Sequence, residues 1–289
     1  MFDSILEFEP LIRLSFFAGV FVAVALWEAA APRRKRGLSR WRRWPSNLGI
    51  VALNTVVVRI LFPVAAVAMA VNASSSGWGL FNLVELPLWV EALLAVIILD
   101  AAIYLQHVMF HAVPALWRLH RMHHADLDYD VTTGARFHPI EIIISMLIKL
   151  AVVAVLGASP VAVIIFEVLL NATAMFNHGN IRLPLAFDGV LRLFIVTPDM
   201  HRVHHSVIAA EANSNFGFNL PWWDLLMGTY RAQPEAGHDD MTIGINSFRD
   251  PVEQRLDKML LQPFKDGGQG YAINATRQAP GPGQQKTGN

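Results

Sequence analysis

The sequence predicts an all-α, polytopic membrane protein, in which a bundle of membrane-spanning helices carries a histidine-rich cap on its cytoplasmic side. Hydrophobic residues make up 54% of the 289 residues and charged residues only 16%, which is too apolar for an ordinary soluble enzyme. The apolar residues form runs long enough for a helix to cross a hydrocarbon core of about 30 Å. Ten of the eleven histidines lie between residues 107 and 205.

Four apolar segments predict the spans. The first three run from about Leu11 to Ala31, from about Leu48 to Val71 and from about Leu88 to Ala112. The fourth, from Ile142 to Phe176, is too long for one span, and the turn residues around Gly157 divide it into a helical hairpin with two short arms.

The distribution of basic residues predicts the orientation. The loop from 72 to 85 contains no lysine or arginine. By contrast, the loop after the first span is rich in them: Arg33, Arg34, Lys35, Arg36, Arg40, Arg42 and Arg43. The positive-inside rule therefore places the first loop in the cytoplasm, and with it the end of the third span and both ends of the hairpin. We interpret the basic loop as a solvated connector that sets the topology, in what we expect to be a bacterial inner membrane.

Composition excludes several classes of protein. The chain has no cysteine, so disulfides, zinc–thiolate sites, cysteine-ligated iron–sulfur clusters and cysteine nucleophiles are excluded together. Its formal net charge is zero, which gives no indication of nucleic-acid binding.

The histidines form three clusters and two isolated positions. An H-x-x-x-H cluster ends the third span, and two H-x-x-H-H clusters follow; spacings of three and four place each cluster on one helix surface. One metal ion takes about four to six ligands, so ten imidazoles exceed the need of one ion and suit two. We predict these metal ligands: His107, His111, His120, His123, His124, His138, His178, His201, His204 and His205.

Three further residues near these clusters receive other roles. Asp100 shares a helical stripe with His107 and is predicted to orient an imidazole through its second nitrogen. Asp199 is likewise predicted to support the ligands without binding metal. Glu141 fits the first turn of a helix that begins with His138 as its cap, which leaves an all-nitrogen ligand set and no catalytic residue beyond the metal centre.

The remaining histidine and three arginines are assigned to the surface. His238 lies between polar residues and is predicted to be exposed. Arg118, Arg121 and Arg202 flank the clusters, and we interpret them as snorkelling side chains at the membrane edge.

The three clusters, in this order and between spans, resemble the fatty acid hydroxylase and sterol desaturase superfamily. The resemblance covers about residues 90–232. Further stretches resemble its bacterial branch: Arg136-Phe137-His138-Pro139, Asn177-His178-Gly179-Asn180, Thr197-Pro198-Asp199, Asn213-Ser214-Asn215-Phe216-Gly217, Trp223-Asp224 and Gly228-Thr229-Tyr230.

The resemblance implies a di-iron centre that uses O₂ and two electrons to hydroxylate or desaturate a lipid, such as a sterol, a fatty acyl chain or an ether lipid. No cytochrome b5-like domain is recognisable, so we expect a separate electron-donor protein. The implied organisation is 1–87 for the first spans and basic loop, 88–232 for the oxygenase core, and 233–289 for a polar extension whose end, from about Thr276, is disordered.

Two other functions also use histidines. A membrane metal-binding or metal-transport protein would place its ligands along a path near mid-bilayer, whereas these clusters gather at one face. A zinc protease would carry H-E-x-x-H, which this sequence lacks.

Overall fold

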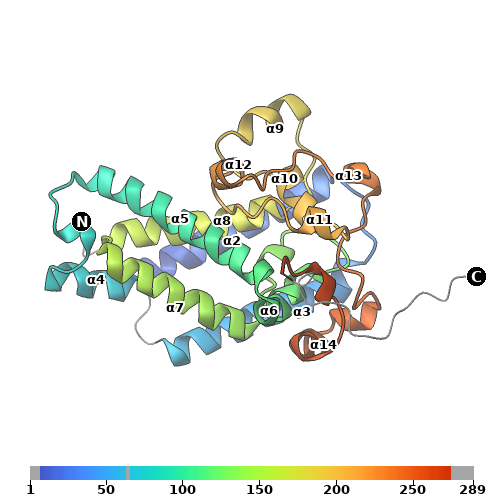
Figure 1. Ribbon diagram of the computed structural model, residues 1–289, viewed down its shortest axis with the longest axis horizontal. Coiled ribbons are helices and arrows are strands. Elements are labelled where there is room, and N and C mark those ends of the chain that lie inside the picture. Colours follow the sequence, from blue (N-terminus) through green and yellow to red (C-terminus); the bar gives the residue numbers. More distant parts are fainter. Residues whose placement is uncertain (1–6, 63–65, 275–289) are drawn as a thin grey trace, which may run out of the picture.

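The computed structural model describes residues 7–62 and 66–274, and within them the secondary structure is helical apart from two isolated β-bridges. Figure 1 shows the long helices side by side along the longest axis, with α4 at one end and the other short α-helices gathered at the opposite end. We call this end the cap; it comprises residues 113–138 and 178–274. The predicted all-α fold class is confirmed.

In the part of the chain that the structure describes, five stretches are long and apolar enough to cross a membrane. Four of them are single helices: α2 (Glu9–Ala30), α5 (Leu88–Ala112), α7 (Pro139–Leu156) and α8 (Pro160–Asn177). The remaining stretch, Arg40–Asn82, contains α3 (Arg40–Leu61), α4 (Ala66–Ser76) and residues outside the described part.

The first span, the third span and the hairpin are confirmed, but the second prediction was wrong in its bounds. Helix α3 begins at Arg40 and not near Leu48, because the arginines of its first turns bind carboxylates of the chain. Both hairpin arms have 18 residues, which corresponds to about 27 Å of helix.

The hairpin turn lies at the end of the bundle far from the cap. Gly157 ends α7 in the left-handed conformation with φ 63°, which glycine adopts readily. A Cβ there would lie 2.5 Å from both Asn82 Nδ2 and the Trp78 carbonyl oxygen. The turn therefore packs tightly against the short segment that precedes α5.

A cluster of charged residues joins three of the spans. Glu167 of α8 is buried and forms an ion pair with Lys149 of α7, and its second oxygen lies 3.1 Å from Arg13 of α2. Arg13 also pairs with Glu9 at 2.8 Å. Charges within spans are tolerated when they face partners, so these side chains connect α2, α7 and α8.

The other helices are short. They are α6 (Pro114–His124), α9 (Leu185–Leu191), α10 (Pro198–His204), α11 (Ala209–Ala212), α12 (Trp222–Met227), α13 (Gly237–Asp240), α14 (Leu256–Leu261), and the 3₁₀ turns η1 (Leu80–Asn82), η2 (Thr133–Ala135), η3 (Pro251–Gln254), η4 (Gln262–Phe264) and η5 (Gln269–Tyr271).

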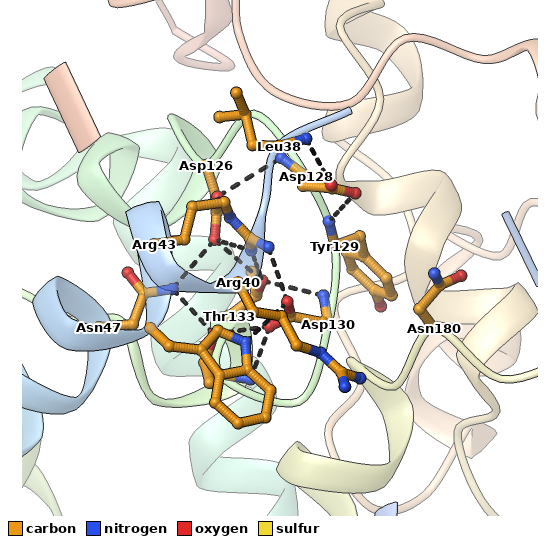
Figure 2. A network of polar contacts seen from close by, with 12 residues as sticks. Leu38, Arg40, Arg43, Asn47, Asp126, Asp128, Tyr129, Asp130, Thr133 and Asn180 are labelled. Carbon is orange, nitrogen blue, oxygen red and sulfur yellow. Dashed lines mark hydrogen bonds and ion pairs between the residues drawn. The ribbon is translucent and has the colours of Figure 1, made fainter. Parts of the chain in front are cut away.

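The basic loop bonds to the cap through buried or half-buried arginines and is not a solvated connector, so that interpretation was wrong. Arg43 is fully buried. Two of its guanidinium nitrogens donate to the Asp126 carboxylate at 2.6 Å, and the third donates to Asp130 at 2.7 Å (Figure 2). Arg34 donates to the carbonyl oxygens of His238 and Met241. Buried carboxylates and carbonyls of the cap thus supply the partners that these guanidinium groups need.

The snorkelling interpretation of the flanking arginines was also wrong. Arg121 is buried and donates to carbonyl oxygens of the segment 262–267, and Arg118 donates to Pro263 O at 2.7 Å. Arg202 is buried and forms an ion pair with Asp199. All three side chains connect parts of the cap. The tail predicted to be disordered from Thr276 lies outside the described residues.

Candidate metal centre

Four helices deliver the clustered histidines to one place at the cap end of the bundle. Helix α5 carries the first cluster in its last two turns, and α6 carries the second. Helix α8 ends immediately before His178, and α10 carries the third cluster. In α10, Thr197 caps the first turn by accepting from Met200 N, and Pro198 occupies the first helical position, as the Thr-Pro pair favours.

Nine of the ten predicted ligands form two buried groups. Within each group, one nitrogen from every ring lies within 4.8 Å of those from all the others. The five-histidine group contains His107, His111, His120, His124 and His204, and the four-histidine group contains His123, His178, His201 and His205.

Each H-x-x-H-H cluster is shared between the groups. In α6 the outer pair, His120 and His124, joins the five-histidine group, and His123 joins the other. In α10 the arrangement is reversed, because His201 and His205 join the four-histidine group and His204 the five-histidine group. The rings of His124 and His205 stack at 4.7 Å across the boundary. Two adjacent sites therefore share two helices.

Four imidazoles direct their Nδ1 atoms to one short segment, residues 213–216, which we call the strap. His107 Nδ1 lies 2.8 Å from Phe216 O and His204 Nδ1 lies 2.7 Å from Ser214 O. His201 Nδ1 lies 3.3 Å from Asn215 O, and His111 Nδ1 lies 3.0 Å from the Asn213 side-chain oxygen. Because oxygens of this kind only accept, these four Nδ1 atoms carry the protons.

Two further imidazoles have partners outside the strap. His178 Nδ1 donates to Ala174 O at 2.7 Å, one turn back in α8. His120 Nδ1 lies 2.6 Å from the buried Glu141 carboxylate, at the start of α7. A carboxylate in this position fixes the ring and increases the basicity of its other nitrogen.

This pattern leaves lone pairs pointing inward. With Nδ1 protonated, a neutral ring has a bare Nε2, yet His107 Nε2 and His120 Nε2 lie 3.1 Å apart. The buried Nε2 atoms of His201 and His204 have no hydrogen-bond partner among the described residues. Two nitrogens each roughly 2.1 Å from one ion, at a right angle, would be about 3.0 Å apart. The donor set therefore fits metal cations.

Burial keeps the rings neutral. It lowers the pKa of His120 and of His178 to about 3. Burial, together with the neighbouring imidazoles, also places the pKa of His123, His124 and His205 well below the usual value. Lone pairs are then available at neutral pH without competition from protons.

Aromatic side chains close around the rings. Phe137 stacks on His123 with centroids 4.6 Å apart, and Phe216 and Phe218 lie 5.4 and 5.2 Å from His107. The site is thus lined by apolar surface, which excludes water from the inward nitrogens.

The comparisons with known proteins agree with this geometry. The Fatty acid hydroxylase family model matches residues 92–229, which contain all nine grouped histidines. The ornithine lipid hydroxylase OlsE of Rhizobium tropici is 31% identical over 272 residues, covering 90% of this chain and 79% of that protein. The chain belongs to the fatty acid hydroxylase family.

Other relatives are more distant. An alkylglycerol monooxygenase of Xenopus tropicalis is 28% identical over 76% of this chain, which spans about half (49%) of that protein's length. The cholesterol 25-hydroxylase of Rattus norvegicus is 24% identical over 57% of this chain and 54% of its own. No solved structure matches.

The strap explains the Asn-Ser-Asn-Phe-Gly stretch that resembled the family. Asn215 has φ 53°, a left-handed conformation that asparagine tolerates, and its side chain bonds to Met200 O and to the backbone of Arg231. Asp224 accepts from the amides of Phe216 and Gly217, both at 2.8 Å. A Cβ at Gly217 would lie 2.8 Å from that carboxylate.

The two aspartates predicted to support the ligands do not contact them. Asp100 accepts from Trp223 Nε1 at 2.8 Å and from the amides of Asn219 and Leu220, just beyond the strap. Asp199 pairs with Arg202 and lies 3.3 Å from Arg33 Nε. We expected these carboxylates to accept from the second ring nitrogen of an imidazole. Oxygens of the strap accept from four of the Nδ1 atoms instead.

Glu141 makes the contact with an imidazole that was predicted for Asp100, so its assignment to the helix start alone was incomplete. The same helix start explains why His138 is in neither group. His138 is the N-cap of α7, where its Nδ1 accepts from Ile140 N at 3.2 Å. The geometry gives its predicted ligand role no support and confirms the predicted cap.

His238 was expected at the surface but is buried, with Nε2 3.7 Å from Asp199.

Replacing Glu141 by glutamine should lower iron content or the rate of lipid oxidation by roughly 10- to 100-fold, the usual effect of losing such a partner. The matched control is Glu91→Gln, which alters a buried carboxylate at the far end of α5 that accepts from Ser159 N. Iron per chain and turnover of both purified variants are the measurements. Equal values for the two variants would show that Glu141 does not orient His120.

Proposed function

We propose that this chain is a membrane-bound, non-haem di-iron monooxygenase that hydroxylates a lipid with O₂ and two electrons from a separate donor protein. One observation carries the proposal. Nine buried imidazoles form two adjacent groups, and the strap, Ala174 and Glu141 hold six of them with the lone pair inward.

Two iron ions bound by these groups would supply the activation of O₂. The five-histidine group would hold one ion and the four-histidine group the other. The residues of the chain supply ring orientation, an apolar enclosure and neutral donors that leave the ions highly charged. The overall reaction consumes a C–H bond, O₂, two electrons and two protons, and yields an alcohol and water.

The relatives favour hydroxylation of a lipid over desaturation. Those described above are named a lipid hydroxylase, a monooxygenase and a sterol hydroxylase. Helices long enough to span a membrane converge on the site, so a substrate dissolved in the bilayer can reach it without crossing water. Within this class, an amphiphile with a long acyl or alkyl chain fits better than a small soluble molecule.

The test combines metal analysis with product analysis. Protein made in iron-rich medium should contain close to two metal ions per chain, chiefly iron. With a reducing system and ¹⁸O₂ it should add one labelled oxygen atom to a lipid that accumulates unmodified in a deletion strain. A single ion per fully active chain would refute the di-iron site. Bound metal without O₂ uptake or product would instead support a metal-binding or transport protein.

We further propose that the metal centre faces the cytoplasm of a bacterial inner membrane. The basic loop bonds to cap residues through Arg34 and Arg43, so loop and metal centre lie on one side. The opposite end, at residues 72–85 and 157–159, has no lysine or arginine, and Asn82 Nδ2 donates to Gly157 O there. The positive-inside rule then assigns the cap side of the bundle to the cytoplasm.

A reporter that is active only in the cytoplasm should be active when fused after Tyr230, within the cap. The matched fusion after Gly77, in the loop without basic residues, should be active only with a periplasmic reporter. The reverse pattern would overturn the orientation and leave the metal centre itself unaffected.

A further inference from the structure

Helix α9 directs its apolar side chains outward and its charged side chain inward. Leu185 is 76% exposed and Val190 60%. Asp188, the only charged residue of the helix, is buried and forms an ion pair with Arg192. A helix on a water-facing surface has the opposite arrangement.

Helix α12 repeats this inversion. Leu226 is 73% exposed and Met227 59%, whereas Asp224 is completely buried under the strap. The indole of Trp222 donates to Leu193 O at 2.8 Å and so joins α12 to the end of α9. The two helices form one continuous surface, which we call the apolar platform.

The platform is a group of neighbouring exposed apolar side chains and not a few isolated surface leucines. Phe187, Leu193, Phe194 and Leu225 add further side chains that are each more than half exposed. Contiguous apolar surface of this kind marks a contact with another protein or with lipid.

The position of the platform along the membrane normal decides between a protein partner and lipid. The carboxylate of Asp100 accepts from Trp223 of α12, and Tyr104 bonds to Thr229 just after that helix. Asp100 is the middle residue of α5, about 18 Å from either end. A spanning helix has its middle in hydrocarbon, so the residues fastened there lie below the membrane surface.

We infer that α9 and α12 are immersed in the acyl-chain region of the cap-side leaflet, and that their occupant is the bilayer. Figure 1 shows both on one flank, beside the cap-side half of the bundle and not beyond its end. Helix α5, to which α12 is bonded, is itself exposed at Leu93 and Leu105, which are 54% and 56% exposed. The inward aspartates are then shielded from lipid, as charges at this depth require.

The platform also links the bilayer to the metal centre. Helix α12 begins six residues after the last residue of the strap, and its Asp224 accepts from the amides of Phe216 and Gly217. This consequence rests on the proposed function: the platform is the lipid-facing wall nearest the strap, where a bilayer lipid would approach the site.

The absence of cysteine from the chain makes a direct test possible. Single-cysteine variants Leu185→Cys and Leu226→Cys, labelled with an environment-sensitive fluorophore, are placed in nanodiscs of phosphatidylcholine and phosphatidylglycerol. Leu93→Cys on α5 is the lipid-facing control. Asp257→Cys on α14, an exposed polar position, is the water-facing control. Emission is measured with and without lipids brominated on their acyl chains.

We expect both platform labels to show the blue shift and quenching of the Leu93→Cys label. Unshifted, unquenched emission like that of Asp257→Cys would overturn the inference. So would a blue shift without quenching, accompanied by energy transfer between labelled chains, because a second copy would then cover the platform. The readout is depth and not turnover, so it is independent of whether the chain oxidises a lipid.

Discussion

Alanine at His204 should abolish lipid oxidation and remove metal from the five-histidine group. The His204 ring packs against three other members of that group, with centroids 4.6 Å from His107, 4.8 Å from His111 and 4.5 Å from His124. Its loss removes one nitrogen donor from a buried site. No water-exposed residue can reach that site to replace the donor. The effect should exceed the roughly 10- to 100-fold loss expected when only an outer partner is removed.

Iron content and product formation of the detergent-purified variant are the measurements. The matched control is His138→Asn, because asparagine is a good N-cap and preserves the start of α7 without an imidazole. It should keep both iron ions and most of the activity. If His138→Asn lost iron as completely as His204→Ala, His138 would be a ligand and the two groups would have to be redrawn.

Local sequence patterns were sufficient for the first span, the third span and the hairpin, and for finding the nine histidines that the fold gathers into two groups. Apolar runs define spans because a helix satisfies its own backbone in lipid, and three- and four-residue spacings define shared helix surfaces. The same spacings could not divide the clusters between two groups. In α6 and α10 that division depends on which helices face each side, and a single helix carries no such information.

Pairings between distant residues were the main omission. Arg43 meets Asp126 and Asp130 more than eighty positions later, so its loop looked like a solvated connector. The strap looked like a family motif without a role, because its function lies in backbone oxygens. Glu141 lies in the first turn of α7 and also contacts the His120 ring. The sequence indicates the helix start but not the contact with His120.

Arg43 is therefore expected to be among the most sensitive positions outside the metal centre. Methionine there keeps much of the side-chain volume but leaves the Asp130 carboxylate buried without a cation, and leaves Asp126 with only Arg136, whose nearest nitrogen lies 3.6 Å away. Although burial raises the pKa of Asp126, the Arg43 guanidinium holds that pKa at about 2. Removing one partner of such a buried pair typically destabilises a protein by about 3–5 kcal/mol.

The damage should extend to the metal centre. Asp126 lies two residues after His124, and Thr133 Oγ1 also donates to its carboxylate, so the segment that leads from α6 to α7 loses its anchor. Thermal unfolding of the detergent-purified Arg43→Met variant, with iron per chain measured on the same sample, should show both losses. Arg42→Met, an adjacent exposed arginine, should show neither.

A second variant separates lost packing from uncompensated charge. In Arg43→Met with Asp130→Asn, the carboxylate that was left without a cation is gone, and part of the lost stability should return because the effects of contacting residues are not additive. Stability no higher than that of Arg43→Met alone would mean that hydrogen-bond geometry, and not charge, dominates. If Arg43→Met matched Arg42→Met in both stability and iron content, the buried network would not be what holds the histidines of α6 in place.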